Sequence, residues 1–244
     1  MVGPSSLTKI RRAVLLLAAL AGAGVAVYSV VDYLAYDEGR EEESLAVGRA
    51  AGIRVAEALD ATLFEIAARA EEYATVVAKL DSEARLLESI ETESRRLPLV
   101  MGVTVAFEPG AFAGKERYAP FFNKERNELQ FVEESYDYTS RELDTAKWYP
   151  AVVDSKASQW SAPYYAKAAE AMVVDYGVPI VSTEGRVKGI VDYTISLRDF
   201  TRIVDSLSVG EAGYGFTYDQ RGAILSHPNP VYLLENVFTL RDGK

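Results

Sequence analysis

The sequence predicts an α+β protein in which an N-terminal transmembrane helix and a long stalk helix precede antiparallel-sheet modules. Three observations predict this class: an uncharged apolar run near the N-terminus, a proline-free stretch with helical periodicity, and short strand-like runs after residue 98. The chain has 244 residues, of which 49% are hydrophobic and 25% charged. These proportions are typical of a folded protein rather than a disordered one.

Residues 13–31 (AVLLLAALAGAGVAVYSVV) carry no charge. At about 1.5 Å per residue, such a helix spans roughly the 30 Å hydrocarbon core of a bilayer. Basic residues precede the run and acidic residues follow it, which predicts a cytoplasmic segment at 1–12 and a body outside the cytoplasm. A cleaved signal peptide ending near Ala21-Gly22-Ala23 is the alternative, and it also exports the body.

Residues 32–97 contain no proline, and their apolar or small residues recur mostly in alternating steps of three and four. This spacing forms one stripe along a helix that would be about 90 Å long. The stripe fits a helix packed on its own domain or a stalk paired with a second copy, and we expect both. Its members include Leu45, Gly48, Gly52, Leu59, Leu63, Ile66, Ala70, Tyr73, Val77, Leu80, Ala84 and Leu87.

After Pro98 the chain consists of short strand-like runs separated by turn residues. The clearest pair, 172–182 and 187–196, is joined by a turn in which Gly185 can adopt a positive φ. We expect residues 98–207 to form one antiparallel-sheet module and residues 208–244 to begin a second. Other expected strands are 100–107, 117–122, 129–134, 214–218 and 223–226, and expected helices are 144–156 and 197–207.

The composition argues against several classes of function. A net charge of −10 offers no basic surface for nucleic acid, and the lack of cysteine removes thiolate metal sites. The single histidine, His227, precedes a proline at a strand end, where a structural role is favoured. The sequence contains no nucleophile elbow, zinc-protease helix or phosphate-binding loop. We therefore expect no catalytic residue, metal or cofactor.

Several stretches, in this order, resemble the double Cache family of extracytoplasmic sensors, which are built from two stacked PAS-like modules. The resemblance implies a membrane-distal, ligand-binding PAS-like module at 98–207 and an incomplete membrane-proximal one at 208–244. The matching stretches are Trp148-Tyr149, Trp160-Ser161-Ala162-Pro163-Tyr164, Val178-Pro179-Ile180, Gly189-Ile190-Val191 with Ile195-Ser196-Leu197, and Gly213–Pro228.

The resemblance places the ligand between the sheet of the distal module and the loops over it. Tyrosine and tryptophan suit such a wall because they combine apolar surface with a polar group, although each aromatic taken singly is more often a core residue. An aspartate within an apolar strand favours a binding role over a structural one. The expected ligand-binding residues are Tyr138, Trp148, Tyr149, Trp160, Tyr164, Asp175 and Thr194.

Amino-acid-binding members of the family carry charged residues at three positions where this chain has Ala146, Ala166 and Thr194. A buried amino acid needs partners for both its carboxylate and its ammonium group. We therefore predict a ligand other than a standard amino acid, with Asp175, Asp192 or Lys147 as the residues that could offer displaced charges. An aromatic cage would suit a cationic or methylated amine.

Together these features predict the sensing region of a bacterial transmembrane receptor, of chemotaxis or two-component type, that is not an enzyme and stops before its output domain. Its expected partners are a small organic ligand, the inner membrane that it crosses once, and a second copy bound through the long helix. The bulk of the chain is expected in the periplasm. A membrane-anchored enzyme such as a glycosidase and a coiled-coil adaptor are the alternatives.

Overall fold

The structure is a computed structural model, and it describes residue 43, residues 45–205 and residues 214–240. The chain divides into two compact units, residues 1–51 and residues 52–244, and the candidate site lies in the second. The transmembrane span expected at 13–31 lies outside the described residues. Within the described residues, no helix has both the length and the apolar character needed to cross a bilayer.

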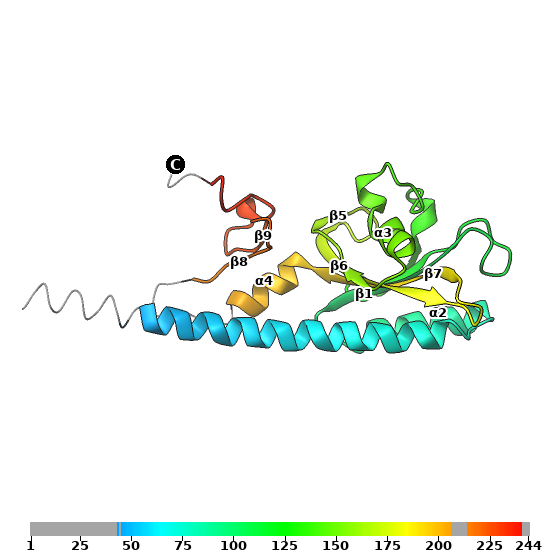
Figure 1. The fold of residues 1–244 in the computed structure, drawn as a ribbon, viewed down its shortest axis with the longest axis horizontal. Helices are drawn as coiled ribbons and strands as arrows, with labels where there is room; N and C mark the ends of the chain where they lie inside the picture. Colours follow the sequence, from blue (N-terminus) through cyan, green and yellow to red (C-terminus); the bar gives the residue numbers. More distant parts are fainter. Residues whose placement is uncertain (1–42, 44, 206–213, 241–244) are drawn as a thin grey trace, which may run out of the picture. The chain divides into compact units, whose positions relative to one another are not determined.

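The expected continuous helix over residues 32–97 is wrong, because the chain forms two helices here. Residues 45–77 are helical, the chain turns at 78–82, and α2 (Glu83–Ser94) follows. Arg69 bonds to Glu93, and Tyr73 bonds to Ser89. These pairs place α2 antiparallel beside the long helix, as Figure 1 shows.

The break in the helix has a local cause. Ser82 is the N-cap residue of α2 and has an extended backbone, with φ −102° and ψ 125°. Serine and aspartate favour such positions, because their short polar side chains compete with helical backbone hydrogen bonds. The predicted apolar stripe is buried or half-buried from Leu59 to Val77, whereas Leu45 near its start is exposed, and in α2 the buried apolar residues are Leu86 and Ile90.

Within the described residues, seven strands form one antiparallel sheet in the order β3-β2-β1-β7-β6-β4, with β5 also paired to β6. The predicted hairpin is confirmed as β6 and β7, and Gly185 in its turn has φ +78°. The strands are β1 (Val100–Phe107), β2 (Pro120–Asn123), β3 (Glu128–Phe131), β4 (Gln159–Trp160), β5 (Tyr164–Ala166), β6 (Ala171–Val181) and β7 (Val187–Ser196).

Different layers cover the two faces of the sheet (Figure 1). The long helix and α2 pack on one face, in a core that includes Ile66, Val103 and Tyr193. Helix α3 (Trp148–Ser155) packs on the other face, in a second core that includes Ile190. The candidate site lies on the α3 face.

The remaining elements are short. Helix α4 (Leu197–Asp205) follows β7 directly, where a helix was expected. Residues 214–240 contain a separate two-stranded sheet of β8 (Thr217–Tyr218) and β9 (Ile224–Ser226). That they begin a second PAS-like module stays a prediction. Three short 3-10 helices complete the list: Val132–Glu134, Asp144–Ala146 and Pro230–Tyr232.

Candidate ligand-binding site

Two buried aspartates lie on adjacent strands of the sheet. In the β6–β7 ladder, Asp175 pairs with Thr194 and Gly177 pairs with Asp192. Because side chains alternate along a strand, these four positions share one face, and the two aspartates are diagonal neighbours. Asp175 is 1% exposed and Asp192 is 3% exposed. Two acidic groups are therefore held close together beneath the layer formed by α3.

The absence of a side chain at Gly177 leaves room beside the aspartates. A Cβ atom at this position would lie 2.6 Å from Cγ2 of Val152 in α3 and 3.4 Å from Oδ1 of Asp192. Real Cβ atoms do not come as close as 2.6 Å to a neighbour. The approach of α3 to β6 therefore depends on glycine at this position.

A cavity of about 480 Å³ opens over this part of the sheet. Its volume falls within the range of roughly 300–1,000 Å³ typical of small-molecule sites. Helix α3, strands β4 and β5 and the loop between them form its walls, and β6 and β7 form its floor. Lining residues include Trp148, Val152, Trp160, Pro163 and Tyr164, together with Asp175, Gly177 and Asp192 on the floor.

Neither aspartate has a full set of hydrogen-bond partners. Oδ2 of Asp175 accepts a hydrogen bond of 2.5 Å from the hydroxyl of Tyr164. Oδ1 of Asp175 and Oδ1 of Asp192 are buried and have no hydrogen-bond partner among the described residues. A buried carboxylate without partners is costly. Such a pair is expected to bind a proton or a cation.

The acidity of both groups reflects this environment. Burial raises the pKa of Asp175 to about 6. Burial, followed by the nearby charge of Asp175, raises the pKa of Asp192 well above its usual range. Burial and the charge of Asp175 also raise the pKa of Tyr164, so this hydroxyl stays protonated and donates to the carboxylate. The charge of the two carboxyl groups on the floor of the cavity therefore depends on whether a cation lies beside them.

Aromatic rings form the apolar part of the cavity. Trp148 is buried, and its Nε1 donates a 3.0 Å hydrogen bond to the hydroxyl of Tyr136. This bond satisfies the polar atom of Trp148 and fixes its ring in the wall. Trp160 is 37% exposed and packs against the ring of Tyr176, with 4.8 Å between ring centroids. Because Trp160 pairs with Tyr176 in the β4–β6 ladder, both of these rings lie on the long-helix face of the sheet. The aromatic wall of the cavity is therefore formed by the rings of Trp148 and Tyr164.

The structure brings four of the seven expected residues to this cavity: Trp148, Trp160, Tyr164 and Asp175. Thr194 lines an adjoining chamber of about 20 Å³, whose walls include Trp148, Tyr164 and Asp192. That volume is about the size of one water molecule. Whether these residues bind a ligand stays a prediction.

The other two expected residues, Tyr138 and Tyr149, lie outside the lining of the cavity. Tyr138 does not belong to the sheet but to the loop after β3; its hydroxyl donates to the carbonyl oxygen of Phe107 and accepts from the backbone N–H of Tyr118. The hydroxyl of Tyr149 donates to Glu108 at 2.6 Å. Both hydroxyls are thus satisfied within the protein, and both rings pack in the core.

Two floor residues, Asp192 and Gly177, were not among the expected binding residues. A signal for both existed in the sequence. Counting back from the four-residue turn at 183–186 pairs residue 177 with residue 192 and residue 175 with residue 194, which is the observed register. A count of this kind would have placed the second carboxylate beside the first.

Known proteins resemble this chain in sequence and in fold. Residues 86–202 match the family model of the first PDC sensor domain of methyl-accepting chemotaxis protein-like receptors. A 90-residue stretch is 29% identical to the methyl-accepting chemotaxis protein PscA of Pseudomonas syringae pv. tomato. That stretch covers 37% of this chain but only 14% of the receptor.

Solved sensor structures share the fold. One, titled as methyl-accepting chemotaxis protein X, has a TM-score of 0.67 and 18% identity over 77% of this chain and 75% of that one. The ligand-binding domain of the Pseudomonas fluorescens chemoreceptor CtaA, solved with L-serine, has a TM-score of 0.58 and 17% identity over 81% of this chain and 77% of that one. The resemblance to Cache sensor domains is confirmed over the matched segment.

Proposed function

Starting from a Cache-type sensor domain at residues 86–202, we propose that this chain is the outward-facing sensing region of a bacterial transmembrane signalling receptor. The cavity on the α3 face of the sheet is its ligand site. In this proposal the chain binds a small molecule without transforming it. Occupancy of the cavity changes the packing of the long helix, which passes the change towards the membrane.

The pair of buried aspartates is the observation that supports one class of ligand. Each has a buried oxygen without a hydrogen-bond partner among the described residues, and both line the cavity. A positively charged group would supply the missing partners, whereas a carboxylate there would meet two like charges. The rings of Trp148 and Tyr164 add faces that attract cations. We therefore propose a cationic amine as the ligand.

The three family positions that hold charged residues in amino-acid-binding members are not charged here. Ala146 and Ala166 are buried small residues, and Thr194 faces the small inner chamber. The acidic groups of this chain stand instead at residues 175 and 192, within β6 and β7. This displacement supports a ligand chemistry different from that of the amino-acid receptors.

A thermal-shift screen of the purified full chain tests the proposal. Amines, organic acids and neutral metabolites are compared, because a ligand that binds only the folded state raises the melting temperature. We expect the amines to give the shifts. Shifts produced by the organic acids alone would exclude a cation site.

A Gly177→Ala variant tests whether the cavity is the site. The new methyl group must displace Val152 or intrude on the floor of the cavity, so we expect at least a tenfold loss of affinity for an amine found in the screen. The double variant Gly177→Ala/Val152→Ala removes the clashing methyl groups and serves as the control. It should recover part of the binding, and unchanged affinity in the single variant would place the ligand elsewhere.

The membrane and dimer predictions belong to the same proposal. The span at 13–31 and the periplasmic location rest on the sequence alone. For the dimer, the long helix carries exposed apolar side chains at Leu45, Val47, Ile53, Phe64 and Val76, and two of them, Ile53 at 52% and Phe64 at 76%, are 11 residues apart. Eleven residues make about three helical turns, so both side chains lie on one side of the helix. We propose that this side pairs with a second copy.

A further inference from the structure

We infer that the cavity is built for a dication, a small molecule with an ammonium group at each of two ends. This inference rests on the proposed cation site and specifies the class of ligand that the site binds. It starts from the number of unpaired carboxylates. Asp175 and Asp192 each line the cavity with a buried, unpartnered oxygen.

The chain does not neutralise these two groups itself. Among the described residues, no lysine, arginine or histidine forms an ion pair with Asp175 or Asp192. Two cationic side chains do line the cavity, Lys147 and Arg221. Lys147 is exposed and pairs with Asp144, and Arg221 is exposed. Neither compensates the buried charges.

A ligand with a single positive charge would pair with only one of the two aspartates. With a monocation beside one aspartate, the other must keep a proton or remain an unpaired buried charge. A ligand with two ammonium groups removes both costs at once. The hydroxyl of Tyr164 bonds to Oδ2 of Asp175, and the nearby hydroxyl of Thr194 also lowers the pKa of this carboxyl. Both partners are neutral, and Oδ1 of Asp175 has no hydrogen-bond partner among the described residues.

The spacing of the aspartates sets the length of the ligand. As diagonal neighbours on paired strands, Asp175 and Asp192 have backbones about 7–8 Å apart. Ammonium groups joined by a chain of about four methylenes can reach both carboxylates. The aromatic walls suit such a chain, because their faces contact methylene groups and attract the charged ends.

A matched ligand series tests the inference by calorimetric titration of the full chain. The probes are 1,4-diaminobutane, 4-amino-1-butanol and 4-aminobutanoate, which share one length and one ammonium group and differ in the charge of the other end. We expect the diamine to bind at least tenfold more tightly than the amino alcohol, and the amino acid to bind most weakly.

Two variants identify the carboxylates responsible. In Asp175→Asn and Asp192→Asn, one carboxylate becomes a neutral amide of similar shape, so the preference for the diamine over the amino alcohol should fall below threefold. Asp154→Asn is the control, because that aspartate is exposed and paired with Arg141. It should keep the wild-type preference, and melting curves confirm that each variant is folded.

The outcomes separate the inference from the proposed function. Equal binding of the diamine and the amino alcohol would refute the dication and leave a cation site. Tightest binding of 4-aminobutanoate would also refute it, because Lys147 or Arg221 would then hold the carboxylate. If no amine binds while organic acids do, the proposed cation site fails as well.

Discussion

At the residue scale, the two floor aspartates oppose folding, and the proposed ligand site gives a reason why they are present. Each is buried, and neither has a cationic partner among the described residues, so each destabilises the folded chain when it is ionised. Sites built for a ligand commonly carry a cost of this kind. The cost should be visible in the unliganded protein.

Replacement of Asp175 by asparagine is therefore expected to stabilise the unliganded chain at pH 7. Burial raises the pKa of Asp175 from its usual 3.8 to about 6, so the folded state holds the proton more tightly than the unfolded state. The free energy of unfolding then falls as the pH rises from about 4 to above 6. At pH 7 the ionisation of Asp175 is expected to lower the free energy of unfolding of the wild type by about 3 kcal/mol.

Melting curves at pH 7 and at pH 4 measure this effect. The variant should melt several degrees higher than the wild type at pH 7, and the difference should shrink at the lower pH, where Asp175 is protonated in the folded chain. Asp154→Asn, which changes an exposed residue, should leave the pH dependence unaltered. A lower melting temperature of Asp175→Asn at pH 7 would show that the carboxylate is stabilised by partners after all.

The same residues show how far a sequence can define a site. A charged residue within an apolar strand is a strong signal, and it drew attention to Asp175, which lines the cavity. The aromatic residues gave a weaker signal, because the residue type alone does not distinguish a ring that lines a cavity from one that packs in the hydrophobic core. Tyr138 and Tyr149 are excluded from the lining by hydrogen bonds to Phe107 and Glu108, and those contacts join segments about 30 to 40 residues apart. Only the folded chain reveals them.

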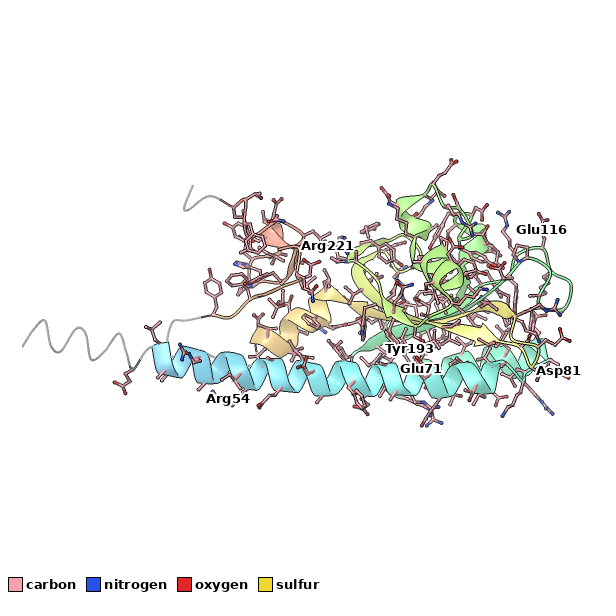
Figure 2. The ribbon with its side chains drawn as sticks, viewed as in Figure 1. Arg54, Glu71, Asp81, Glu116, Tyr193 and Arg221 are labelled. Carbon is pink, nitrogen blue, oxygen red and sulfur yellow. The ribbon has the colours of Figure 1, made fainter. Side chains whose placement is uncertain are left out.

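At the element scale, strand β7 has two different faces. Asp192 lines the cavity on the α3 side and Thr194 lines the chamber beside it, whereas Tyr193, labelled in Figure 2, points to the long helix. The hydroxyl of Tyr193 donates a 2.8 Å hydrogen bond to Glu93 of α2. Glu93 also accepts from Arg69 of the long helix. One strand therefore contacts the ligand cavity on one side and the helical layer on the other.

Removal of this hydroxyl tests how much the contact stabilises the helical layer. Tyr193→Phe is expected to lower the free energy of unfolding by about 1.5–3 kcal/mol, because the lost hydrogen bond is to a charged, buried group. Urea denaturation measures the change. Amine affinity should stay within about twofold of the wild type, since the cavity is on the opposite face.

Tyr165→Phe provides the control for this change. Tyr165 is 51% exposed, so loss of its hydroxyl should change stability by less than about 0.5 kcal/mol. Equal losses in both variants would show that the bond to Glu93 contributes nothing specific. A large fall in amine affinity in Tyr193→Phe would instead place this tyrosine in the binding site.

The elements themselves were predictable where the local pattern was long. The β6–β7 hairpin follows from two strands rich in β-branched residues around a glycine turn, and the structure confirms it. Strands β4 and β5, of two and three residues, are too short for any periodicity. The helix break at 78–82 was missed because the apolar spacing continues through it, although Asp81 and Ser82 are residues that begin helices.

At the scale of the whole molecule, a sensor must connect a cavity to the membrane. The sheet carries the cavity on its α3 face and the long helix on the other, so a change at β7 reaches that helix through one layer of side chains. A small movement there changes the packing of a rigid element. Paired helices in a dimer would convert that change into a relative movement of two chains, which makes the state of association central to the proposal.

Replacement of Phe64 by serine tests the dimer. Phe64 is 76% exposed on the long helix, and a large aromatic side chain at the centre of an interface commonly dominates its energy. We expect Phe64→Ser to weaken self-association of the full chain at least tenfold in sedimentation experiments, without loss of folding stability. Val76→Ser is the matched control, because Val76 is also exposed but lies about a third of a turn around the helix. If both variants associate like the wild type, this side of the helix is not the interface, and the signal must leave the cavity by another route.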